Sequence, residues 1–318
     1  MTRENIKKKT RIVFLGTPDF AVASAEAIVA AGIEIACIVT VPDRHAGRGR
    51  KICQSAMKEW AVAQKLPILQ PESLKDAAFI EALKRFEADL FIVVAFRILP
   101  REVFSIPALG TINLHGSLLP RYRGAAPINW AIIQGERETG VTTFFIDDKV
   151  DTGNILLKAH LEIGEDEDFG ELYDRLKIRG ASLLVETIEG VMIGGLKPFP
   201  QSGTATRAPK ITPEVCTIDW SKSATEIRNV VRGLSPVPGA RSRLNNKGLK
   251  IFSCTSHTWP GDEQAGTVCH VDCDNGALFI RCGEGAISVK DLQVEGKRRM
   301  AVSDFLRGCQ IKVGDALK

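Results

Sequence analysis

Short apolar runs alternate with helical patterns through the first 193 residues of this chain. The run 89–95 (DLFIVVA) is apolar at nearly every position, which is typical of a strand buried on both faces of a parallel sheet. Similar strand-like runs occur at 11–16, 33–40, 110–115 and 140–146. Helical patterns lie at 18–31, 55–65, 76–86, 126–134 and 169–192. This alternation predicts a doubly wound, Rossmann-like α/β domain.

The composition changes near residue 194. Residues 194–211 are rich in Gly, Pro, Ser and Thr and lack periodicity, which predicts a linker. Beyond them, a helical pattern precedes several short β-like runs separated by turn residues, which predicts a small OB-like β-barrel. A chain of 318 residues has room for two domains. We therefore expect domains at 1–193 and 212–318. The expected elements of the second domain are the helix 223–234 and the strands 249–252, 266–271, 277–281 and 286–291.

Charge and cysteine content limit the class of protein. The net charge of +4 permits a nucleic-acid partner but does not argue for one. The apolar run after the basic start, 12–15, is too short for a signal-peptide core or a membrane span, so we expect a cytoplasmic protein without membrane contact. The segment Cys269-His270-x-x-Cys273 has no second ligand pair at a matching spacing, so we expect small apolar strand residues and no metal site.

The first expected β–α turn argues against a nicotinamide-dependent dehydrogenase. Its sequence is Gly16-Thr17-Pro18-Asp19, which is not the G-x-G-x-x-G loop that cradles a pyrophosphate. A single glycine at this place is explained by a tight turn.

Polar side chains end two of the expected strands. Asn113 and His115 are two residues apart at a strand end, so their side chains point to the same side, and Asp151 follows another strand. Ligands of open α/β sheets bind beyond the carboxyl ends of the strands. There, Asn can donate to a developing oxyanion, His can move a proton or donate to the same oxygen, and Asp can orient or charge the His. The alternative is structural: a hydrogen-bonded His at a strand end and an Asp-x-Gly turn.

The segment 113–127 (NLHGSLLPRYRGAAP), followed by Asp151-Thr152-Gly153, closely resembles the folate-dependent formyltransferase family. The likeness extends across almost the whole chain. The Asn-x-His…Asp set is shared with relatives that act on a purine precursor or an amino sugar. Three further segments are similar to the members that act on charged tRNA: 16–20 (GTPDF), 42–51 (PDRHAGRGRK) and 218–220 (IDW).

The resemblance implies a function and a set of site residues. It implies transfer of a formyl group from 10-formyltetrahydrofolate to the α-amino group of methionyl initiator tRNA, by a monomer that needs no metal. It assigns catalysis to Asn113, His115 and Asp151. It assigns binding of the reduced folate to Ser117, Leu118, Leu119 and Pro120. It assigns tRNA contacts to Arg44, Arg48, Arg50 and Lys51 in a loop that reorders on binding, and further tRNA binding to the second domain.

One segment departs from the family pattern. Residues 96–100 (FRILP) stand where the family often has Tyr-Gly-x-Ile-Leu-Pro, one residue longer, and this loop should border the pterin. Two other functions remain open. One is an enzyme of the same fold acting on a small amine, which would not need the second domain or the Arg-rich loop. The other is a non-catalytic RNA-binding protein, which would not need the Asn113, His115 and Asp151 set.

Overall fold

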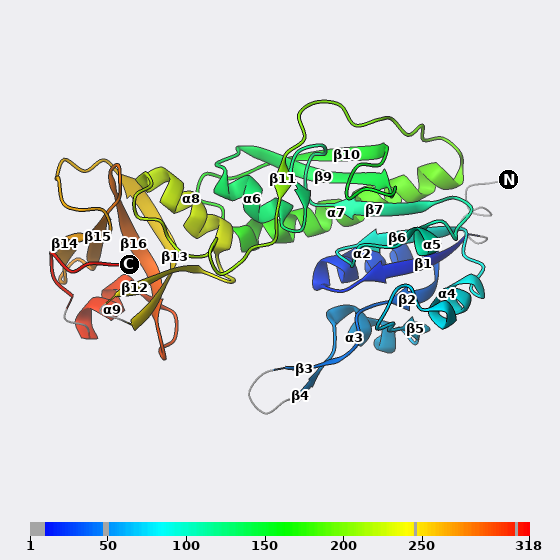
Figure 1. Ribbon diagram of the computed structural model, residues 1–318, viewed down its shortest axis with the longest axis horizontal. Coiled ribbons are helices and arrows are strands. Elements are labelled where there is room, and N and C mark those ends of the chain that lie inside the picture. The colour runs from blue at the N-terminus through cyan, green and yellow to red at the C-terminus, as the bar shows by residue number, and fades with distance from the viewer. Residues whose placement is uncertain (1–9, 47–50, 245–246, 309–310) are drawn as a thin grey trace. The chain divides into compact units, whose positions relative to one another are not determined.

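The computed structural model (Figure 1) describes residues 10–46, 51–244, 247–308 and 311–318. A seven-stranded sheet forms the centre of the first half, in the order β10-β9-β7-β6-β1-β2-β5. Its strands are β1 (Arg11–Gly16), β2 (Glu34–Val39), β5 (Ile68–Leu69), β6 (Leu90–Val94), β7 (Thr111–His115), β9 (Glu138–Phe145) and β10 (Ile155–Glu162).

Most neighbours in this sheet are parallel, which confirms the Rossmann-like prediction. β1 lies between β2 and β6, parallel to both, and β6 is parallel to β7. The strand predicted at 140–146, β9, is different because it runs antiparallel to β7. A strand's apolar pattern is the same in either direction, so the sequence could not indicate this reversal.

Helices cover the sheet where the periodicity places them. Gly16 is the last residue of β1, and a Cβ there would lie 2.5 Å from Ala21 Cβ, so the turn into the next helix has no room for a larger residue. A Cβ at Gly180 would lie 3.0 Å from Leu114 Cδ2, so α7 packs directly against β7. The helices along this part of the chain are α2 (Asp19–Ala30), α3 (Ala56–Ala63), α4 (Ala77–Lys84), α5 (Arg101–Phe104), α6 (Pro127–Ile133) and α7 (Phe169–Met192). Of these, α6 instead belongs to the second compact unit, where it packs with α8 (Ala224–Leu234).

The chain divides into two compact units whose sequences are interleaved. The first contains residues 1–124, 140–161 and 174–207, and the second contains 125–139, 162–173 and 208–318. The second unit thus takes in two stretches that precede residue 193, one around α6 and one around the start of α7. The contiguous boundaries at 193 and 212 stay a prediction.

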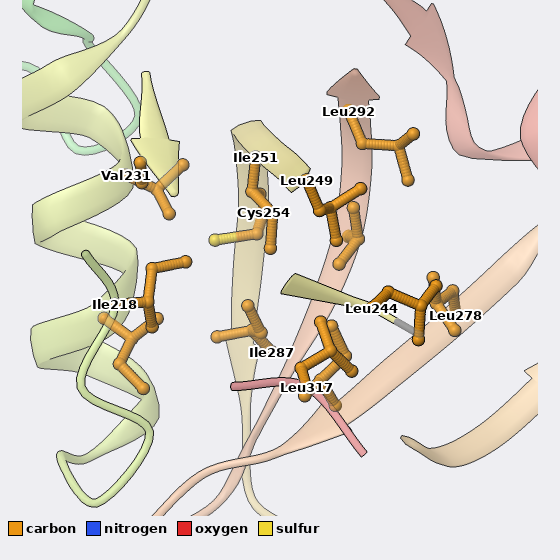
Figure 2. Close-up of a cluster of buried hydrophobic side chains, with 14 of the residues drawn as sticks. Ile218, Val231, Leu244, Leu249, Ile251, Cys254, Leu278, Ile287, Leu292 and Leu317 are labelled. Carbon is orange, nitrogen blue, oxygen red and sulfur yellow. The ribbon is translucent and has the colours of Figure 1, made fainter. Parts of the chain in front are cut away.

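The second unit contains a separate antiparallel sheet, in the order β12-β13-β16-β15-β14, with β17 paired to β16. Its main core lies between this sheet and α8, where Val231, Ile251 and Ile287 are fully buried (Figure 2). This arrangement confirms a β-rich second domain. The elements are α8 (Ala224–Leu234), β12 (Ala240–Leu244), β13 (Lys247–His257), β14 (Val268–Asp272), β15 (Ala277–Arg281), β16 (Ala286–Val294), β17 (Met300–Ala301) and α9 (Val302–Gly308).

Two small sheets complete the fold. β3 (Arg44–Ala46) and β4 (Lys51–Cys53) form an antiparallel hairpin. β8 (Arg123–Gly124) pairs with β11 (Arg207–Ala208).

Candidate active site

Asn113 and His115 lie on β7, at the carboxyl end of the parallel part of the sheet. In the register, Asn113 is opposite Val93 of β6 and Phe144 of β9, and His115 is opposite Thr142. His115 is buried, whereas the Asn113 side chain is partly exposed. Among the residues that the structure describes, none forms a hydrogen bond with the Asn113 amide. Its N–H groups therefore remain available to a ligand.

The ring of His115 is oriented by a backbone carbonyl. Its Nε2 lies 2.8 Å from the oxygen of Tyr122, and because a carbonyl only accepts, Nε2 carries the hydrogen. The expectation that His115 donates to an oxyanion is thus restricted, since this N–H is already used. The nitrogen that remains able to take a proton is Nδ1.

Asp151 lies beside that nitrogen. Its Oδ2 is 3.8 Å from His115 Nδ1, and the same oxygen accepts a hydrogen bond of 2.8 Å from the amide of Gly124. At 3.8 Å the neutral ring and the carboxylate make no hydrogen bond, but a proton on Nδ1 would create an ion pair. The structure therefore brings together His115, at the end of β7, and Asp151, in the turn between β9 and β10, although 36 positions separate them in the sequence.

The backbone around Asp151 is specialised. Asp151 has a φ of +54°, in the left-handed region that costs most residues energy. Two residues later, a Cβ on Gly153 would lie 1.6 Å from the oxygen of Phe145, so only glycine fits. The Asp-Thr-Gly turn therefore reverses the chain and also places the Asp151 carboxylate beside His115.

The predicted folate-binding segment, 117–120, is fixed by hydrogen bonds to Thr142 and by burial of most of its side chains. Thr142 Oγ1 donates to the oxygen of Ser117 (2.7 Å) and accepts from the amide of Leu119 (3.1 Å). The side chains of Ser117 and Leu119 are fully buried, and Leu119 packs with Phe144 and Ile155. Leu118 is only partly buried and Pro120 is buried. Three of the four predicted residues, Ser117, Leu119 and Pro120, thus face the protein interior, and only Leu118 is partly exposed.

Lys158 was not predicted, yet it contacts this segment. Its Nζ donates a hydrogen bond of 2.5 Å to the oxygen of Leu119. Burial lowers the pKa of the Lys158 ammonium below its ordinary value. A lysine at one position of a strand (β10) gives no local signal of such a role, because the contact is 39 residues away.

The loop that departs from the family pattern borders a cavity of about 390 Å³. Arg97 fixes this loop by donating to the carbonyl oxygens of Pro71 (2.7 Å) and Glu72 (3.0 Å). Burial is the main reason that the pKa of Arg97 is lowered, and the nearby charge of Arg44 adds to the effect. The cavity is lined by Leu74, Lys75, Ile98, Leu99, Pro100, Arg101 and Glu102.

The expected tRNA loop is partly a β-hairpin. Arg44 is exposed and starts β3, and Lys51 starts β4. Arg48 and Arg50 lie outside the described residues. Just before the hairpin, Asp43 accepts hydrogen bonds from Lys58 (2.5 Å) and Gln70 (2.9 Å), and these lower the pKa of its carboxyl group.

Neither a metal cluster nor a membrane span is evident within the described ranges. No group of three or more His, Cys, Asp and Glu residues is placed there to hold a metal ion. No helix in the same ranges is both long and apolar enough to cross a bilayer.

Solved structures support the fold. An N-formyltransferase from Helicobacter canadensis, in complex with folinic acid and dTDP-3-aminofucose, matches with a TM-score of 0.66 and 19% identity, over 92% of this chain and 100% of that chain. HypX from Aquifex aeolicus, in complex with tetrahydrofolic acid, matches with a TM-score of 0.64 and 19% identity, over 96% of this chain and 50% of that chain.

Sequence comparisons are more specific. A methionyl-tRNA formyltransferase from Azobacteroides pseudotrichonymphae is 45% identical over 94% of this chain and 96% of its own length. One from Caldanaerobacter subterraneus subsp. tengcongensis is 43% identical over 97% of this chain and 100% of its own. The family model for formyl transferase matches residues 10–188, and the model for the formyl transferase C-terminal domain matches residues 210–310. The chain therefore belongs to the formyl transferase family.

Proposed function

We propose that this enzyme transfers the formyl group of 10-formyltetrahydrofolate to the α-amino group of methionyl initiator tRNA. The observation that carries the proposal is that relatives named for this activity match the chain over nearly its whole length, including the C-terminal family segment. The product, N-formylmethionyl-tRNA, serves translation initiation. The enzyme acts as a monomer.

The reaction needs a proton acceptor and an oxyanion donor. An α-amino group has a pKa of about 7.7–8.0, so near neutral pH it is largely protonated and must lose a proton before it attacks. Negative charge then develops on the formyl oxygen, and the free amide of Asn113 donates to it. His115 takes up the proton at Nδ1, because Tyr122 occupies its other nitrogen. Asp151 stabilises the imidazolium through the resulting ion pair. When the tetrahedral intermediate collapses, the bond between the formyl carbon and the folate nitrogen N10 breaks, and the imidazolium returns its proton to that nitrogen, which leaves as tetrahydrofolate.

The reduced folate binds along 117–120, with its pterin beside 96–100. Support comes from the rigidity of the first segment, which Thr142 and Lys158 hold in place, and from the cavity beside the second. A fixed backbone presents its polar groups to a planar ligand at a small entropic cost.

Replacing Lys158 by methionine tests the role of this segment. The variant keeps the length of the side chain but removes its hydrogen bond to Leu119. A hydrogen bond to a charged group contributes about 1.5–3 kcal/mol, and we expect part of this loss to raise the KM for folate by about 3- to 10-fold. Steady-state kinetics at saturating tRNA measures it. Lys84→Met, at an exposed pair with Glu81, is the control and should change nothing.

The hairpin between Arg44 and Cys53 contacts the acceptor end of the tRNA through Arg44, Arg48, Arg50 and Lys51. Two observations support this contact. Arg44 is exposed, and the carboxylate of Asp43 is paired with Lys58, so Asp43 does not compete with phosphates for the arginine side chains. Guanidinium groups suit phosphates because they donate in a fixed fork.

Changing Arg44, Arg48 and Arg50 together to alanine should weaken tRNA binding and reduce its salt dependence. The logarithm of the tRNA binding constant falls linearly with the logarithm of the salt concentration, and each lost phosphate contact makes this slope less steep by about 0.7–0.9. The loss of three contacts should therefore make it less steep by about 2–3. Filter binding of charged initiator tRNA over a salt series measures this slope. The Lys84→Ala, Arg85→Ala variant removes two exposed charges at the C-terminal end of α4 and should keep the full slope. An unchanged affinity in the triple variant would refute the role of the hairpin.

One assay tests the activity itself. The enzyme is incubated with 10-formyltetrahydrofolate and one of three acceptors: charged initiator tRNA, charged elongator tRNA or a free amino sugar. A formylated product is expected with the initiator. Product from the amino sugar alone would instead indicate the small-amine enzyme, and no product from any acceptor would favour a non-catalytic protein.

A further inference from the structure

The segment that follows α7 is bound to the loops of the active site. Phe199 exchanges two backbone hydrogen bonds with Ile155 at the start of β10 (2.8 and 3.0 Å). Further along, Thr206 Oγ1 accepts from the amide of Tyr122 (2.8 Å), and the oxygen of Thr206 accepts from the amide of Arg123 (2.9 Å). A stretch whose composition indicates a linker is thus bound both to the start of β10 and to the loop at 122–123. Figure 1 shows it passing above β10 before it reaches β11.

Gln201 lies between these two attachments and joins the loops directly. Its Nε2 donates to the carbonyl oxygens of Asp151 (2.9 Å) and Gly153 (3.0 Å). Its Oε1 accepts from Nε (3.2 Å) and from one terminal nitrogen (2.6 Å) of Arg123. The orientation of the amide is determined, because two carbonyls require the NH₂ group and a guanidinium requires the oxygen.

These contacts act on the atoms that place the catalytic pair. The carbonyls that Gln201 holds belong to Asp151, the left-handed residue whose side chain lies beside His115, and to Gly153, two residues later. Arg123 directly follows Tyr122, whose carbonyl fixes the His115 ring, and directly precedes Gly124, whose amide holds the Asp151 carboxylate. Gln201 is therefore connected to the catalytic pair through both loops. The loop at 122–124 contacts the His115 ring and the Asp151 carboxylate, and the loop at 151–153 carries Asp151 itself.

We infer that Gln201 is a positioning residue for catalysis, which sets the separation of the His115 and Asp151 side chains by joining the backbones of their two loops. It does so without touching a substrate, and the inference rests on the proposed function. Both polar atoms of the Gln201 side chain are used within the protein, so replacing this side chain affects the reaction through alignment. A displacement of about 1 Å at a reacting group can cost about 10²-fold in rate.

The test is the Gln201→Leu variant, assayed for formyl transfer to charged initiator tRNA. We expect kcat to fall about 10- to 100-fold, with the KM values for folate and for tRNA within about two-fold of wild type. Gln201→Glu should be impaired as well, because it keeps the acceptor for Arg123 but replaces the donors to Asp151 and Gly153. The matched control is Gln293→Leu, which removes a single hydrogen bond from another partly buried glutamine to the oxygen of Lys297 and should leave kcat unchanged.

A double-mutant cycle with Arg123→Leu separates alignment from general loosening. If the two residues act through one contact, the double variant should be about as slow as the slower single variant. The inference is overturned if Gln201→Leu keeps the kcat of wild type, or if both KM values and the Tm deteriorate together with kcat. Either result leaves the proposed function intact so long as the wild type formylates the tRNA. Failure of the wild type to do so would instead remove the proposed function.

Discussion

Replacing Asn113 by alanine should lower kcat by about 10²–10³ while leaving the fold and tRNA binding intact. Loss of one preorganised oxyanion donor typically has an effect of this size. The side chain of Asn113 has no hydrogen-bond partner among the described residues, so its truncation should change Tm little. Single-turnover formylation with saturating folate isolates the chemical step and measures the loss.

Two further variants sharpen this prediction. Asn113→Asp has nearly the same shape but replaces both N–H donors by a charged acceptor, so it should be at least as slow as the alanine variant. Asn154→Ala truncates an exposed asparagine that follows the Asp-Thr-Gly turn, and it should behave as wild type. If Asn113→Ala retains near-normal turnover, Asn113 does not stabilise the oxyanion.

Changing Asp151 to asparagine should reduce kcat by about 10²–10⁴. The variant keeps an oxygen that can accept from the Gly124 amide, so the loop retains its shape, but the negative charge beside His115 Nδ1 is lost. Without that charge, the imidazolium formed when His115 takes the proton is no longer stabilised. Removing the carboxylate partner of a catalytic histidine by the same substitution has about the upper magnitude in serine proteases.

A second aspartate in the same loop provides the control. Asp147 is exposed, and its carboxylate accepts from the hydroxyl of Thr152 (2.6 Å), away from His115. Asp147→Asn should therefore lower kcat by less than about two-fold, since exposed substitutions of this kind usually change little. Equal losses in the two variants would mean that Asp151 acts only through the structure of its loop.

Local patterns in the sequence predicted the regular elements well. The helix 169–192 and the strand 277–281 have the predicted bounds, because side-chain periodicity within one element depends on which face is buried. Two strands with weaker local signals were not predicted. The strand β5 has only two residues, and in β10 the polar residues Lys158 and His160 interrupt the apolar run. The family resemblance drew attention to Asn113, His115 and Asp151 together, although spacing alone left a structural role open.

The sequence by itself determined most of the strands and helices of the first domain, the presence of a second β-rich domain and the chemical groups at the strand ends. Only the tertiary structure decided that β9 reverses direction, that His115 presents Nδ1 to Asp151, and that Gln201 joins the two catalytic loops. The physical reason is distance along the chain. Helical and strand periodicities arise between near neighbours, whereas Gln201 lies 50 residues from Asp151 and 78 from Arg123, and their contacts exist only once the chain has folded.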